Sequence, residues 1–281
     1  MNKNNMIRKG LVVILLYVLL FGHINVSFAT STNDALTTVK YHRIISLKPN
    51  ITKLLESLGV SKEIIGVTKF CEKPHATAVI IGDYNSIDLE TIIRLKPDLI
   101  LGSNENSQKK QYQQLIRANL NLKVFDFYNY EQMKTSLQSI GTLLHREERA
   151  QEIALNMDRQ LNQLKEINSL ESKRNKTFIA IVQRRPLMLA SGDTFISTLL
   201  EKAGLRNSFR LNQISYPVVD EEEVVRELVD YTFDFSHDVK EEDSYFLNKK
   251  IVPLKLHDYL AAPQSVANLV EVFKMNNQQP R

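Results

Sequence analysis

The sequence predicts an α/β fold in which two similar parallel-sheet lobes are bridged by a single long α-helix, with a ligand cleft between the lobes. Short apolar strands alternate with amphipathic helices, which is typical of parallel sheets with helical crossovers. Segment 88–101 matches segment 220–233 without gaps, and no glycine or proline occurs between Gly141 and Pro186. The expected divisions are a signal peptide, a first lobe, a linking helix and a second lobe: 1–29, 30–142, 143–173 and 174–281.

The first lobe is predicted to alternate strands with helices. Short, β-branched strands are expected at 43–47, 64–67, 99–101 and 123–127. Helices are expected at 52–58, 88–96, 111–118 and 130–144. Pro49 and Asn50 are expected to end the first strand, and Gly59 to end the first helix. Asp88 is the expected N-cap of the second helix, with Glu90 in its first turn, where the helix dipole favours a carboxylate.

One long helix is predicted after the first lobe. Its apolar side chains recur at spacings of three and four residues: Ala150, Ile153, Met157, Leu161, Leu164 and Ile167. This pattern predicts an amphipathic helix of about 24 residues, roughly 36 Å long. A coiled coil is the alternative, although the apolar face covers too few heptads for one.

The second lobe is predicted to resume the alternation. Strands are expected at 177–182, 231–235 and 251–256. Helices are expected at 194–203, 221–229 and 264–274.

An internal repeat relates the two lobes. In the first pair of segments the matched acidic residues are Asp88 with Asp220, Glu90 with Glu222, and Asp98 with Asp230. A second pair, "LLESLGV" at 54–60 and "LLEKAGL" at 199–205, occurs in the same order on the two sides of the long helix. Short amphipathic helices can match by chance. Two ordered matches favour two lobes of equivalent topology.

The first 29 residues have the organisation of a secretory signal peptide. Lys3, Arg8 and Lys9 precede the apolar run 11–21, and Ser27-Phe28-Ala29 supplies small residues before a cleavage site. We expect cleavage after Ala29 and a periplasmic protein. An uncleaved membrane anchor is the alternative, which the short apolar run disfavours.

Charge and cysteine content restrict the possible partners. Removal of the signal peptide takes away three positive charges and lowers the formal net charge from +4 to 4 − 3 = +1. The mature chain therefore has no basic excess that would indicate nucleic-acid binding. Cys71 is the only cysteine, so no intrachain disulfide can form. Cys71 is interpreted as a small apolar filler rather than a ligand to iron or cobalt.

Several segments together resemble the periplasmic substrate-binding proteins of ABC importers that carry cobalamin, iron-siderophores or haem. They are "RIISLKPNITKLLESLG", "IIGVTKFCEKP", "DLETIIRLKPDLILGS", "SGDTFISTLLEKAGLRN" and "YPVVDEEEVV". The resemblance covers most of residues 42–275. It implies two lobes with small hinge motion, a metal-chelate ligand between them, and a monomer. It also implies that one glutamate on each lobe, here Glu90 and Glu222, docks on arginines of an inner-membrane permease.

Candidate ligand contacts follow from loops at the ends of the strands. They are Lys48, Phe70, Tyr84 and Ser103 in the first lobe, and Arg184, Arg185, Tyr216, His257 and Tyr259 in the second. Aromatic rings offer flat apolar area to a macrocycle, and paired arginines bind carboxylates. Tyr84 and Tyr216 could instead be half-buried turn residues, and the two arginines could belong to a solvated loop.

An enzyme is the weaker interpretation. The sequence has no P-loop, no G-x-S-x-G and no G-x-G-x-x-G motif. The mature chain's histidines are scattered without metal-ligand spacing, so neither a metal site nor a cofactor is expected. The alternatives are an exported α/β hydrolase-like enzyme that uses Ser46 or Ser191 with His257, and a sensor or scaffold that keeps the carrier fold without transport.

Overall fold

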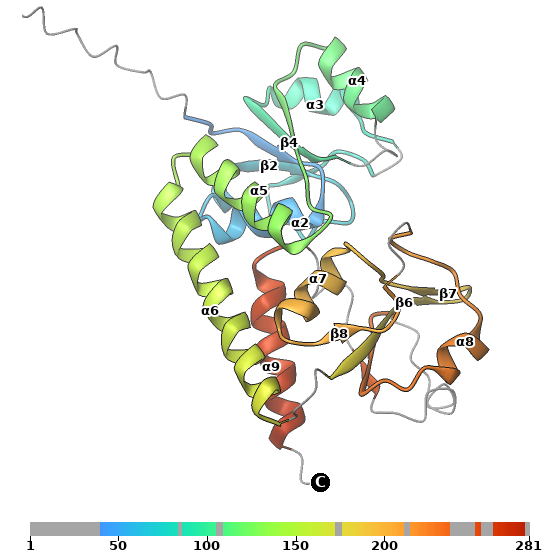
Figure 1. Cartoon of the computed structure of the whole chain (residues 1–281). Helices are drawn as coiled ribbons and strands as arrows, with labels where there is room; N and C mark the ends of the chain where they lie inside the picture. The colour runs from blue at the N-terminus through green and yellow to red at the C-terminus, as the bar shows by residue number, and fades with distance from the viewer. Residues whose placement is uncertain are drawn as a thin grey trace, which may run out of the picture. The chain divides into compact units, whose positions relative to one another are not determined.

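Two five-stranded sheets account for the strands in the part of the chain that the computed structural model describes (Figure 1). The described residues are 40–83, 86–104, 109–171, 176–210, 214–236, 251–253 and 261–278. All of them belong to one compact unit, Lys40–Arg281.

The first sheet is parallel throughout, as predicted, and its strand order is β3-β2-β1-β4-β5. Its strands are β1 (Ile44–Ser46), β2 (Ile64–Val67), β3 (Val79–Ile80), β4 (Leu99–Ser103) and β5 (Leu122–Phe125). The chain runs outward from β1 to β3 and then returns to β4 on the other side of β1. The carboxyl ends of β1 and β4 therefore border the topological switch point, where ligands bind in open α/β sheets.

The four predicted helices of the first half are confirmed, and their boundaries differ from the predicted ones by up to three residues. They are α2 (Pro49–Ser57), α3 (Leu89–Leu95), α4 (Lys109–Arg117) and α5 (Tyr130–Leu143), with a short 3-10 helix at Ser61–Glu63. The strand ends before Pro49 as expected, and α2 begins at Pro49, three residues before the predicted start at Thr52. Proline suits the first position of a helix, since its missing N–H would have no intrahelical partner there.

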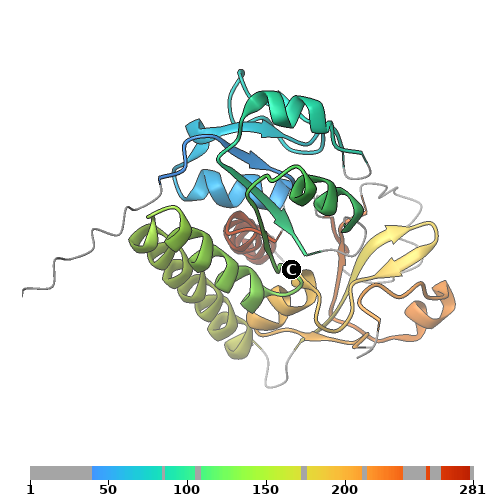
Figure 2. The same ribbon diagram turned by 90° about the horizontal axis from the view of Figure 1, so that it is seen from above.

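The predicted long helix is α6 (Glu147–Glu171), 25 residues in length. Its buried face carries Ala150, Ile153, Met157, Leu161 and Leu164 as expected, whereas Ile167 is exposed. Figures 1 and 2 show α6 alongside α5 and α9 (Gln264–Gln278), and it also contacts α7 (Phe195–Lys202).

One hydrophobic cluster joins the two halves of the chain. It contains Ile44 and Leu101 from the first sheet, Phe178 and Phe233 from the second, and the apolar face of α6 between them. The long helix is therefore part of a core that both sheets share.

The second sheet is mixed, so the prediction of a purely parallel second lobe was wrong. Its strands are β6 (Thr177–Arg184), β7 (Leu187–Leu189), β8 (Arg206–Asn207), β9 (Tyr231–Asp234) and β10 (Ile251–Pro253). β8 and β9 lie parallel to β6, and β10 lies parallel to β9. β7 is antiparallel to β6, because only Arg185 and Pro186 separate these two strands and a parallel pair needs a much longer connection.

The internal repeat is visible in matched hydrogen bonds at the start of the strands. The Asp98 carboxylate accepts the backbone N–H groups of His42 and Arg43 at 2.7 and 3.0 Å. The Asp230 carboxylate accepts the backbone N–H of Thr177 at 2.7 Å. Arg43 immediately precedes β1 and Thr177 begins β6. The two matched aspartates therefore make equivalent hydrogen bonds, which link β4 to β1 in the first sheet and β9 to β6 in the second.

The second matched pair has the same helix ending in both halves. At the end of α2 the backbone N–H groups of residues 58, 59 and 60 donate to carbonyls 54, 56 and 55. At the end of α7 those of residues 203, 204 and 205 donate to carbonyls 199, 201 and 200. Gly59 and Gly204 both adopt positive φ, +76° and +89°, which glycine allows without strain. The two segments therefore share a helix ending as well as a sequence pattern, which supports the repeat.

Candidate functional site

Three predicted ligand residues lie at the carboxyl edge of the first sheet. Lys48 follows β1, Phe70 follows β2, and Ser103 ends β4. Lys48 and Ser103 are buried on the two sides of the switch point, whereas the Phe70 ring is 48% exposed. The Lys69 Nζ lies 5.0 Å from the centre of that ring. This edge therefore offers an aromatic face beside polar groups.

A buried group of hydroxyls surrounds Cys71 beneath this edge. The Thr68 hydroxyl and the Cys71 thiol are 3.2 Å apart, and Thr52 Oγ1 donates to the Lys48 carbonyl at 3.2 Å. Burial raises the pKa of the Cys71 thiol, although hydrogen bonds from Thr52 and Thr68 oppose the shift. A thiol that stays protonated is a poor metal ligand. This result supports the interpretation of Cys71 as a core filler.

A buried ion pair stands at the carboxyl edge of the second sheet. Arg184 ends β6 and Asp234 ends β9, and the Asp234 side chain is fully buried. Arg184 donates to Asp234 Oδ2 from Nε at 2.7 Å and from Nη2. Asp234 Oδ1 accepts the N–H and the hydroxyl of Ser236 at 2.8 and 2.7 Å. Asp234 was not among the predicted site residues, and Arg184, here 11% exposed, was predicted only as a ligand contact.

The neighbouring predicted residues of the second half are open to solvent. Arg185 is exposed directly after β6. Tyr216 is 47% exposed on a segment whose backbone pairs with β7 through Pro217 and Val219. Tyr84, His257 and Tyr259 lie outside the described residues. The structure thus groups Lys48, Phe70 and Ser103 at the carboxyl edge of the first sheet, and Arg184 and Arg185 at that of the second. Tyr216 lies away from this edge, beside Leu189 and Ser191 and level with the middle of β6.

The serines of the hydrolase alternative are poorly placed for catalysis. Ser46 and Ser191 are both fully buried. The Ser46 hydroxyl lies 2.8 Å from Thr52 Oγ1 and donates to the Lys48 carbonyl at 3.1 Å. A nucleophile needs access to its substrate, and burial denies it to both serines. Among the described residues, no group of three or more His, Cys, Asp and Glu side chains could hold a metal ion.

Glu90 and Glu222 are both exposed in the first turn of their helices, α3 and α8 (Glu221–Arg226). Asp88 caps α3, accepting the Thr91 N–H at 2.9 Å and the Thr91 hydroxyl at 2.6 Å. These two hydrogen bonds lower the pKa of Asp88. Asp220 makes no such cap bond at α8. Glu222 has an ion pair of 3.2 Å with Arg226 along the helix.

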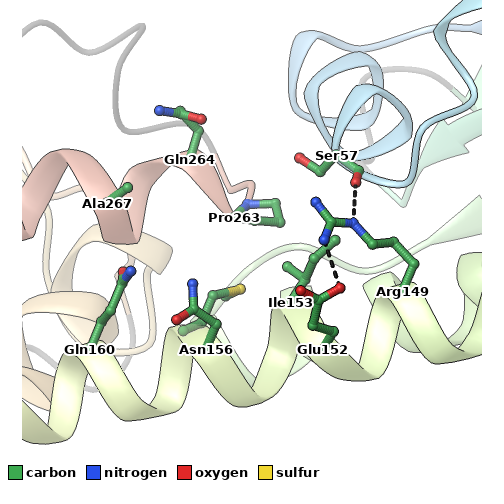
Figure 3. A pocket seen from close by; sticks show the side chains of 10 residues that line it. Ser57, Arg149, Glu152, Ile153, Asn156, Gln160, Pro263, Gln264 and Ala267 are labelled. Carbon is green, nitrogen blue, oxygen red and sulfur yellow. Dashed lines mark hydrogen bonds and ion pairs between the residues drawn. The ribbon is translucent and has the colours of Figure 1, made fainter.

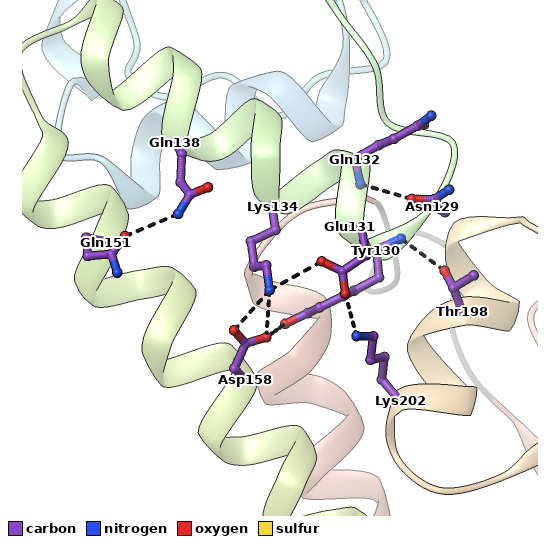
Figure 4. A network of polar contacts seen from close by, with 10 residues as sticks. All are labelled: Asn129, Tyr130, Glu131, Gln132, Lys134, Gln138, Gln151, Asp158, Thr198 and Lys202. Atoms are coloured by element: carbon purple, nitrogen blue, oxygen red, sulfur yellow. Dashed lines mark hydrogen bonds and ion pairs between the residues drawn. The ribbon is translucent and has the colours of Figure 1, made fainter.

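A network of hydrogen bonds and ion pairs links α5, α6 and α7 to one another (Figure 4). On α5, the Tyr130 hydroxyl donates to Asp158 of α6 at 2.9 Å, and Lys134 Nζ lies 3.0 Å from the same carboxylate. Glu131 joins Lys134 at 3.3 Å and also pairs with Lys202 of α7. Burial raises the pKa of Tyr130, so its hydroxyl remains a donor to Asp158. The network connects the two halves beside their shared core.

Lys202→Ala is expected to lower stability slightly and to weaken its dependence on pH. The hydrogen bond from Lys202 is the main cause of the lowered pKa of Glu131. A carboxylate with a lowered pKa adds stability at neutral pH and loses it as the pH falls through that pKa. Both side chains are about half exposed, so the loss should stay under about 1 kcal/mol. Urea unfolding at neutral pH and at about pH 3 checks this. Equal losses at the two pH values would contradict this expectation. Arg159→Ala, at an exposed position of α6, is the control.

A separate pocket of about 330 Å³ lies where α2, α6 and α9 meet (Figure 3). Arg149 donates to the Ser57 carbonyl at 3.2 Å and pairs with Glu152 at 2.7 Å along its rim. Its lining contains none of the predicted ligand residues. This pocket is therefore distinct from the predicted ligand residues at the carboxyl edges of the two sheets, which we call the strand-end groups.

Comparison with known proteins gives one family and several relatives. Residues 44–250 match the sequence model of the periplasmic binding protein family. A vitamin B12-binding protein of Pectobacterium carotovorum subsp. carotovorum (strain PC1) is 24% identical over 186 residues, 66% of this chain and 67% of the relative. Two solved structures share the fold, a possible iron-binding protein of Staphylococcus epidermidis and a periplasmic haem-binding protein of Vibrio cholerae. The first has a TM-score of 0.69 at 22% identity, covering 86% of this chain and 100% of that one. The second has a TM-score of 0.70 at 19% identity, covering 83% and 99%.

Proposed function

The chain belongs to the periplasmic binding protein family, and on that premise we propose that it carries a metal-chelate ligand to an ABC importer. The observation that carries the proposal is that the family match begins at β1 and extends beyond β9, so it includes most of both sheets of the repeat. This is a family of binding proteins and not of enzymes. Relatives named for vitamin B12, iron and haem favour cobalamin, a ferric siderophore or haem as the ligand.

The two strand-end groups are the proposed ligand site. Ligands of α/β proteins bind outside the carboxyl ends of the strands, where Lys48, Phe70 and Ser103 lie in the first sheet and Arg184 and Arg185 in the second. Tyr216 remains a proposed contact on the segment beside β7. Phe70 and Tyr216 supply exposed aromatic faces that suit a flat macrocycle. Arg185 is the better candidate for a ligand carboxylate, because Arg184 already pairs with the buried Asp234. Tyr84, His257 and Tyr259 remain proposed members of the site, and the lobes 30–142 and 174–281 with the linking segment 143–173 remain the proposed division.

Export and docking complete the proposal. Segment 1–29 is proposed to direct the chain to the periplasm, where the homologues are named as acting. No helix among the described residues is long and apolar enough to cross a membrane. The exposed carboxylates of Glu90 and Glu222, at matched positions of the repeat, are proposed to bind arginines of the permease while the carrier itself stays monomeric.

Ligand titration tests the carrier function. Purified mature protein should bind cobalamin, haem or a ferric siderophore with a Kd of about 1 µM or less, equivalent to at least about 8 kcal/mol. Arg185→Ala should weaken a carboxylate-bearing ligand more than about tenfold, since it removes a charged hydrogen-bond donor. Arg159→Ala, an exposed arginine on α6, is the matched control. Absence of binding to all three ligand classes would remove the main support for the proposal.

A sensor or scaffold that retains the fold is the second candidate. It would bind ligand equally well but would not support uptake, so transport assays separate the two functions.

A further inference from the structure

Arg185 lies on the two-residue turn that joins β6 to β7, at the carboxyl edge of the second sheet. Its side chain is exposed, whereas the preceding Arg184 is paired with the buried Asp234. Connecting segments are more mobile than the strands they join. The affinity of this edge for a ligand carboxylate therefore depends on what holds the turn in place.

The Gln183 side chain holds the turn directly. Its amide nitrogen Nε2 donates to the Arg185 carbonyl at 3.1 Å and to the Pro186 carbonyl at 3.4 Å. The second contact is long and adds less than the first. Both backbone carbonyls of the turn are thus linked to one side chain near the end of β6. Gln183 is exposed, so these hydrogen bonds bear on the shape of the turn rather than on the core.

The two residues that flank the turn are held as well. The Asp234 carboxylate accepts two hydrogen bonds from Arg184, and it also accepts the N–H and the hydroxyl of Ser236 at 2.8 and 2.7 Å. On the other side, the Val219 N–H donates to the Leu187 carbonyl at 3.0 Å. The turn is therefore fixed at both ends to neighbouring segments of the second half.

We propose that Gln183 and Asp234 are positioning residues, which hold this turn so that Arg185 meets a carboxylate of the ligand. This inference rests on the proposed carrier function, with Arg185 as its carboxylate contact. A turn that is ordered before binding loses less conformational entropy when the ligand binds, so affinity rises without an additional contact. Asp234 also engages Arg184, which leaves the exposed Arg185 to meet an incoming carboxylate.

Haem, which bears carboxylates, and haem dimethyl ester, which bears none, are the probes that test this proposal. Gln183→Met keeps the length of the side chain and removes the donor. It should weaken haem binding by about three- to tenfold, the effect of one lost hydrogen bond, and leave binding of the ester unchanged. Gln138→Met on α5 replaces another exposed glutamine, which donates to Gln151 at 3.1 Å, and should bind haem as the wild type does. Thermal melting checks that each variant is folded.

A double-mutant cycle separates positioning from a direct contact. A positioning residue acts through Arg185, so Gln183→Met should cost no further haem affinity in the Arg185→Ala protein. An equal loss in the two backgrounds overturns the inference, because Gln183 would then act without Arg185. Asp234→Asn, which removes the charge that holds Arg184, should give the same pattern in the folded protein.

The outcomes distinguish this inference from the proposed function. Wild-type haem affinity in Gln183→Met, together with a loss in Arg185→Ala, overturns the positioning role and leaves the carboxylate contact standing. Equal binding of haem and its ester by the wild type overturns the inference and the contact, whereas the carrier function stands. If the wild type binds neither compound, the inference is overturned, and titration with cobalamin and a ferric siderophore decides the carrier function separately.

Discussion

Alanine at both Glu90 and Glu222 is expected to abolish transport while the protein remains folded and able to bind its ligand. Both side chains are exposed in the first turn of a helix, so their loss should cost under about 1 kcal/mol of stability. Two weak contacts on one body reinforce each other, so removing both should lower docking far more than removing either one. Each single variant should retain intermediate transport.

The controls for this experiment come from the same chain. Glu147 and Glu148 are exposed first-turn acids of α6, and their double alanine variant should transport as wild type. Asp88→Ala should lower stability by about 1 kcal/mol through loss of the cap on α3. Uptake of labelled ligand by cells, with unfolding and ligand affinity measured in parallel, gives the comparison. Wild-type uptake by the Glu90/Glu222 double variant would refute the docking role.

Asp234→Ala is expected to destabilise the protein by about 3–5 kcal/mol, because it leaves the mostly buried Arg184 without its counter-ion. A loss of this size corresponds to a fall in Tm of roughly 10 °C for a chain of this length. The double variant Asp234→Leu with Arg184→Met should be more stable than Asp234→Ala, since apolar side chains of similar volume replace a buried pair at little cost. Urea unfolding of the three proteins checks both statements. A loss under about 1 kcal/mol in Asp234→Ala would show that water reaches Arg184.

Patterns within a single segment were predictable from sequence. The period of apolar residues along α6 and the capping aspartate of α3 are local, and both are confirmed. The repeat was also predictable, because Asp98 and Asp230 occupy the same place before matched strands. The antiparallel β7 was missed, since three residues are too few to show the alternation that identifies a strand.

The environment of the site residues could not be predicted in the same way. Arg184 and Asp234 are 50 residues apart in sequence, and only the parallel pairing of β6 with β9 brings them together. A charged residue that follows a buried strand can equally face a ligand or a buried partner.

The core shared by the two sheets has a practical consequence for biosensor design. A pair of fluorophores placed on the two halves reports ligand only if their separation changes, and the continuous packing of Ile44, α6 and Phe178 opposes such a change. A single environment-sensitive dye at a strand-end loop, next to Phe70 or Arg185, is the better choice. Cys71 is buried beneath the first sheet edge, so an introduced surface cysteine could be labelled selectively without removing it.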